Sequence, residues 1–113
     1  MVLALRCLKG VASACLSICL VACFGPGPDK LLATAKQHLE RGDRKAAVIE
    51  VKNALQKKND NTEARLLLGQ VLLESGDIRG AEVELRRARD QGAPTDQVMP
   101  LLLRAYVATG QFK

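Results

Sequence analysis

The chain has 113 residues, a length that allows one small domain. Aromatic residues make up 3% and tryptophan is absent, so the core must consist of aliphatic side chains, which suits packed helices better than a sandwich of sheets. The formal net charge is +5, but beyond Lys9 the two signs are interspersed and no aromatic side chains accompany the basic ones, which argues against a nucleic-acid partner.

The segment from Met1 to Ala22 has the organisation of a secretory signal peptide. Met1–Lys9 holds two positive charges and no acid, and Gly10–Ala22 is an uncharged run. A charged start before a short apolar run is typical of such signals, whereas a membrane span takes about 20 apolar residues. Gly25-Pro26-Gly27-Pro28 then predicts a break before the folded part.

The end of this segment, Leu20-Val21-Ala22-Cys23, is similar to the lipobox of bacterial lipoprotein precursors. The resemblance implies cleavage before Cys23, acylation of its sulfur and amino group, and a lipidated tether over residues 23–29. Two or three acyl chains anchor a protein stably to a membrane. A plain signal peptide is the alternative interpretation. Phe24 stands where the signal for inner-membrane retention has aspartate, so the resemblance favours the outer membrane, with the domain facing the periplasm.

All four cysteines, Cys7, Cys15, Cys19 and Cys23, belong to this N-terminal segment and its lipobox-like end. No disulfide can therefore staple the rest of the chain, and no metal-ligand spacing occurs in it. We expect no metal and no cofactor. Cys15 ends a second lipobox-like string, Ala12-Ser13-Ala14-Cys15, which is a weaker match because it cuts the apolar run short.

The remainder of the chain contains an internal repeat. Gly42, Gly76 and Gly110 are equally spaced, and residues 28–61 laid onto 62–95 give identical residues at Leu32/Leu66, Leu39/Leu73, Glu40/Glu74, Gly42/Gly76, Asp43/Asp77, Ala47/Ala81, Glu50/Glu84 and Ala54/Ala88. This spacing is the period of the tetratricopeptide repeat. The pattern predicts an all-α solenoid of antiparallel helix pairs, with repeats at 30–61 and 62–95 and the first helix of an incomplete third repeat at 96–113.

Helix signals agree with this period. Each glycine can take the left-handed conformation that closes a helix, and Asp43 and Asp77 stand where a side-chain oxygen can cap the next one. The second helices carry one apolar stripe, formed by Ala47, Val51, Ala54, Ala81, Leu85 and Ala88. Small residues at the paired positions Ala35/Gly69 and Ala47/Ala81 should let the two helices of a repeat approach closely.

The third repeat is predicted to begin with a helix from about Val98 to Thr109, followed by Gly110-Gln111-Phe112-Lys113. A solenoid normally closes with a polar capping helix, and about three repeats are usually needed for stability. We therefore expect the chain to be the N-terminal part of a longer array; alternatively, a partner or a second copy covers this end.

Particular strings add a narrower resemblance. They include Leu31-Leu32-Ala33-Thr34-Ala35-Lys36, Lys52-Asn53-Ala54-Leu55-Gln56 and Glu63-Ala64-Arg65-Leu66-Leu67-Leu68-Gly69. Residues 30–113 resemble the N-terminus of the PEP-CTERM system TPR-repeat lipoproteins, whose lipobox has the same place. That resemblance implies a role in exopolysaccharide export or in the handling of proteins sorted by this system.

No catalytic constellation is evident, and we expect no enzyme activity. The single histidine, His38, lies on the apolar face of the first helix and is expected in the core or at a groove edge. The resemblance to tetratricopeptide repeats places binding on the concave face, lined by the first helix of each repeat. Its candidate binding residues are Lys36, Glu40, Gln70, Glu74 and Arg104.

The second helices carry a basic ridge that could lie near anionic headgroups: Lys52, Lys57, Lys58, Arg86, Arg87 and Arg89. The leading hypothesis is a membrane-anchored scaffold that binds protein or peptide partners of the cell envelope, in contact with the polysaccharide machinery. The alternatives are a lipoprotein for pilus or outer-membrane protein assembly and the docking arm of a larger envelope enzyme.

Overall fold

The protein is described by a computed structural model, which covers residues 25–111. These residues form five helices and no strand: α2 (Pro28–Glu40), α3 (Arg44–Lys57), α4 (Thr62–Glu74), α5 (Ile78–Asp90) and α6 (Thr95–Thr109). The prediction of an all-α helical repeat is confirmed. The predicted signal peptide and its lipidated Cys23 lie outside the described residues.

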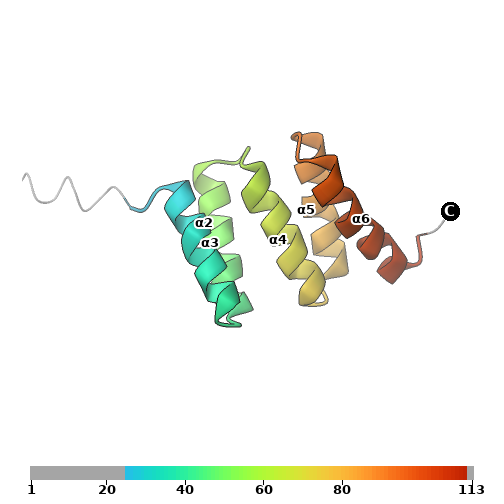
Figure 1. Ribbon diagram of the computed structural model, residues 1–113, viewed down its shortest axis with the longest axis horizontal. Coiled ribbons are helices and arrows are strands. Elements are labelled where there is room, and N and C mark those ends of the chain that lie inside the picture. Colours follow the sequence, from blue (N-terminus) through green and yellow to red (C-terminus); the bar gives the residue numbers. More distant parts are fainter. Residues whose placement is uncertain (1–24, 112–113) are drawn as a thin grey trace, which may run out of the picture.

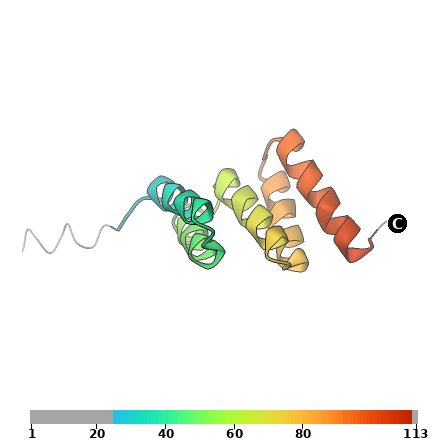
Figure 2. The same cartoon turned by 60° about the horizontal axis from the view of Figure 1, so that its bottom comes forward.

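The helices are arranged in a row of two layers (Figure 1). We refer to α2, α4 and α6 as the A layer and to α3 and α5, which lie behind them in this view, as the B layer. Each helix packs against its neighbours in sequence, and α4 also contacts α6. Figure 2 shows the pairs α2/α3 and α4/α5 as successive units, followed by α6.

Local signals fix several of the helix ends as predicted. Gly42, Gly76 and Gly110 have φ angles of 78°, 85° and 70°, the left-handed region that glycine enters without steric cost. The backbone N–H of Ala46 donates to Asp43 Oδ1, and that of Gly80 donates to Asp77 Oδ1, each over 3.0 Å. Both predicted N-caps are thus confirmed, and each satisfies a donor that the first turn leaves unpaired.

Two helices begin earlier than the sequence predicted. Helix α2 starts at Pro28, inside the segment assigned to the tether, because proline at the first helical position needs no N–H partner and already has a helical φ. Helix α6 starts at Thr95, directly after Pro94, and not at Val98. Its first turn holds Asp96, whose negative charge suits a helix N-terminus.

The core consists of two aliphatic clusters, one around α2, α3 and the start of α4, the other around α4, α5 and α6. Leu72 packs against both and so joins them. The predicted stripe of the B helices is fully buried, with 0% exposure at Ala47, Val51, Ala54, Ala81, Leu85 and Ala88.

The predicted close approach within a repeat is also confirmed. A Cβ placed on Gly69 would lie 2.6 Å from both Cγ and Cδ2 of Leu85 in the paired helix. In the first repeat the corresponding residues are Ala35 and Val51, both fully buried. Glycine is thus paired with leucine and alanine with valine, which keeps the packed volume similar in the two repeats.

None of the helices between residues 25 and 111 is both long and apolar enough to cross a membrane.

Candidate binding surface

The five candidate binding residues are all exposed on the A layer. They differ in the ion pairs and hydrogen bonds that they form with the rest of the described chain. Lys36 Nζ lies 2.6 Å from Glu63 Oε1 of the next A helix. This ion pair is more than half exposed on both sides, so it adds little to stability and can be exchanged for a ligand's charges.

Two further candidates lie together on α4. Gln70 Nε2 donates to Glu74 Oε1 over 3.2 Å, and Arg44 Nε at the start of α3 lies 3.8 Å from Glu74 Oε2. Glu40 and Arg104 form no salt bridge with the rest of residues 25–111. A ligand's carboxylate can therefore approach Arg104 without displacing a carboxylate of the described chain.

Two hollows lie along the A layer between α4 and α6. One, of about 340 Å³, is lined by Leu73, Ile78, Arg104, Val107 and Ala108. It combines a mainly apolar wall with one guanidinium, a combination suited to an aliphatic side chain beside an acidic group. The other, of about 370 Å³, lies toward the opposite end of the same helices and is lined by Thr62, Glu63, Leu66, Ala93, Pro94 and Gln97.

A buried polar network behind this surface was not predicted. Arg65 of α4 is only 5% exposed. Its Nη1 donates to Glu84 Oε2 over 2.8 Å, its Nε to Gln91 Oε1 over 3.0 Å, and its Nη2 to both oxygens of Asn59, the backbone carbonyl at 2.6 Å. Arg65 thereby ties the turn between the repeats to α5. The repeat alignment contained a signal for the burial of Arg65. It pairs Arg65 with Leu31, which is buried, and so places Arg65 on the inner face of α4.

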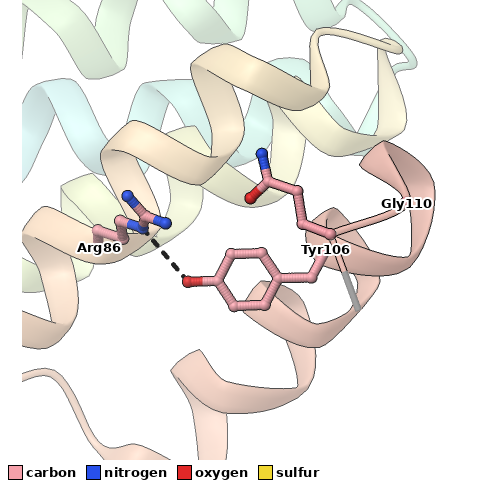
Figure 3. A pocket seen from close by; sticks show the side chains of 4 residues that line it. Arg86, Tyr106 and Gly110 are labelled. Atoms are coloured by element: carbon pink, nitrogen blue, oxygen red, sulfur yellow. Dashed lines mark hydrogen bonds between the residues drawn. The ribbon is translucent and has the colours of Figure 1, made fainter. Parts of the chain in front are cut away.

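A second unpredicted contact links α5 to α6. Arg86 Nε donates to the Tyr106 hydroxyl over 3.2 Å, and the guanidinium lies 5.7 Å from the centroid of the tyrosine ring. Figure 3 shows both side chains, which line a cavity of about 650 Å³ together with Gly110 and Gln111. The hydrogen bond to Tyr106 raises the pKa of Arg86, and the Glu82 carboxylate adds to this effect.

His38 is half-buried on α2, in agreement with the groove-edge interpretation. Between residues 25 and 111, no group of three or more His, Cys, Asp or Glu side chains is placed to hold a metal ion.

Comparison with known proteins adds one finding. A family model described as tetratricopeptide repeat matches residues 38–99, more than half of the chain, from α2 into α6. No curated protein matches the sequence.

Proposed function

The chain belongs to the tetratricopeptide-repeat family, and from this premise we propose that it is a lipid-anchored scaffold that binds protein or peptide partners in the bacterial cell envelope. Solenoids of this type use extended faces of stacked repeats for binding. The observation that carries the proposal is the pair of hollows along the A layer, one mainly apolar with Arg104 at its wall and one with Glu63 and Gln97 in its lining.

The proposed ligand is a segment with an aliphatic side chain for the hollow beside Leu73 and an acidic group for Arg104. A photo-crosslinking amino acid at Gln70, on the A layer, should give discrete adducts with envelope proteins in cells. The same group at Gln56, exposed on the B layer, is the matched control. Equal adducts from both positions would refute an A-layer site.

The proposed anchor is the Cys23 thiol, and it is supported by the lipobox-like string before it. Cys23→Ser should abolish labelling with palmitate and release the protein from membranes, whereas Cys15→Ser should leave both unchanged. Labelling that persists in Cys23→Ser would show that the anchor lies elsewhere or is absent. Density-gradient separation of the two membranes then tests the proposed outer-membrane location.

The proposed pathway is exopolysaccharide export with PEP-CTERM protein sorting, and it is supported by the resemblance of residues 30–113. Deletion of the gene should reduce secreted polysaccharide or release sorted proteins into the medium, and the wild-type chain should restore both. A deletion strain that loses pili or outer-membrane barrels with unchanged polysaccharide would favour one of the alternative pathways.

A further inference from the structure

Charge is divided unequally between the two layers. The B helices α3 and α5 carry eight Lys or Arg residues and four Asp or Glu residues. The A helices α2, α4 and α6 carry four basic and five acidic residues. The modest net charge of the whole chain therefore conceals a basic B layer behind an A layer that is slightly acidic.

The outward side of the B layer repeats one pattern in register. An exposed aliphatic residue stands between two cations in α3, and the same arrangement recurs at the equivalent repeat positions in α5. We call these residues the outer stripe: Lys45, Ile49, Lys52, Arg79, Val83 and Arg86. Ile49 and Val83 are 59% and 49% exposed. Nothing in the core requires an aliphatic residue at either position.

The cations of the outer stripe are mostly unneutralised. Lys45, Lys52 and Arg79 form no salt bridge within residues 25–111, whereas Arg86 pairs with Glu82 at 2.6 Å. The side chain of Arg86 is nevertheless half exposed. The stripe therefore presents positive charge and aliphatic groups together.

The start of the described chain is fastened near this side of the molecule. Lys57, in the last turn of α3, donates from Nζ to the carbonyl oxygen of Pro26 over 2.6 Å. Residues 25 and 26 thus lie against the B layer, only a few positions after Cys23.

We propose that the outer stripe rests on an anionic lipid surface, with Ile49 and Val83 reaching into the headgroup region and the flanking cations on the lipid phosphates. Aliphatic residues among cations are what an interfacial membrane contact uses. A polysaccharide or a nucleic acid would gain nothing from Ile49 and Val83. This proposal goes beyond the proposed function: it uses none of the A-layer residues and leaves that layer turned away from the lipid.

The absence of tryptophan from the chain allows a direct test. A Val83→Trp variant carries a single tryptophan, placed on the outer stripe, and Gln70→Trp places one on the A layer as the matched control. Each full chain is reconstituted from detergent into vesicles of phosphatidylcholine alone or with an equal part of phosphatidylglycerol. Only protein that floats with the vesicles is measured, so the reading does not depend on how the N-terminal segment is attached or on whether Cys23 is acylated.

In the anionic vesicles the emission of Trp at position 83 should shift to the blue and be quenched by brominated lipid, while Trp at position 70 stays unchanged. Adding Lys45→Glu and Lys52→Glu should return the emission to its value in neutral vesicles, because each cation near an anionic surface contributes roughly a fivefold factor to the contact. The matched reversal Lys30→Glu with Arg41→Glu, which changes the net charge equally at α2, should leave it shifted.

Identical emission in neutral and anionic vesicles, or an equal response at position 70, would overturn the proposal. A larger response to soluble polygalacturonate than to the vesicles would assign the stripe to a polysaccharide instead. Persistence of palmitate labelling in Cys23→Ser, which would refute the anchor, would not change either outcome, so failure of the anchor and failure of the stripe are distinguishable.

Discussion

The packing of Gly69 against Leu85 allows a sharp test of the repeat geometry. The proposed perturbation is to transplant the pair from the first repeat, where Ala35 and Val51 occupy the corresponding positions, into the second. This requires Gly69→Ala, Leu85→Val and the double variant. Each single change should destabilise the protein, and the double variant should be restored.

The expected changes in unfolding free energy can be estimated from the structure. A Cβ on Gly69 meets Leu85 Cγ and Cδ2 at 2.6 Å, and overpacking of this kind costs about 1–3 kcal/mol. Replacing a helical glycine by alanine returns about 1 kcal/mol, so Gly69→Ala should cost roughly 1 kcal/mol overall. Leu85→Val removes one methylene from a fully buried side chain, a loss of about 1 kcal/mol.

In the double variant the new methyl group fills the space that Leu85 gives up. Its stability should return to within about 0.5 kcal/mol of the wild type, which corresponds to a coupling energy of about 1.5–2 kcal/mol. Urea unfolding followed by far-ultraviolet circular dichroism gives the unfolding free energy of each variant. The coupling energy follows from these values, provided that the dependence of the unfolding free energy on urea is the same for all variants.

A control double variant combines Gly69→Ala with Leu32→Val, which lies in the other core cluster, and its effects should add. Additive effects of Gly69→Ala and Leu85→Val, within about 0.5 kcal/mol, would refute the reasoning. The helices would then separate to admit the Cβ, and Leu85 would not be the residue that limits their approach.

Three further predictions concern single features and use the same unfolding assay. Arg65→Leu should cost about 3 kcal/mol because it leaves the largely buried Glu84 carboxylate with only the exposed Arg87 as an ion-pair partner. Adding Glu84→Gln should recover part of the loss, and equal stability of the single and double variants would contradict this. Asp77→Ala should cost about 1 kcal/mol by removing the cap on Gly80 N–H, and Asp77→Asn, which keeps the acceptor, should cost much less. Pro100→Ala should stabilise the protein by about 2 kcal/mol, because a proline inside a helix removes a backbone hydrogen bond and crowds the preceding turn. An unchanged or lower urea concentration at the midpoint of unfolding would contradict this and indicate that α6 is already adapted to Pro100.

The sequence predicted those parts of the fold that depend on period and local chemistry. The glycines at 42, 76 and 110, the capping aspartates and the buried stripe of the B helices all follow from the internal repeat combined with the rules for helix ends and helix faces. The start of α2 was misjudged because Pro28 was taken as part of a break, although proline is also a favoured first residue of a helix.

The contacts of charged side chains were harder to predict. Arg65 and Arg104 look alike in the sequence, yet one is buried with four acceptors and the other is exposed without a salt bridge in the described part of the chain. The acceptors of Arg65 come from α5, from its C-cap and from the turn before α4, and the alignment of Arg65 with Leu31 indicated its burial but not these partners. The A-layer candidates were identified by analogy with other repeats, and only the structure revealed that Lys36 already faces Glu63.

The row of helices also determines how this domain should acquire its structure. Its contacts join elements that are adjacent or nearly adjacent along the chain, so little loop-closure entropy must be lost before native contacts form. Folding can begin in either helix pair and spread to its neighbour across α4, where Leu72 belongs to both core clusters. A chain that emerges gradually, one end first, can therefore build its core progressively without waiting for a distant segment.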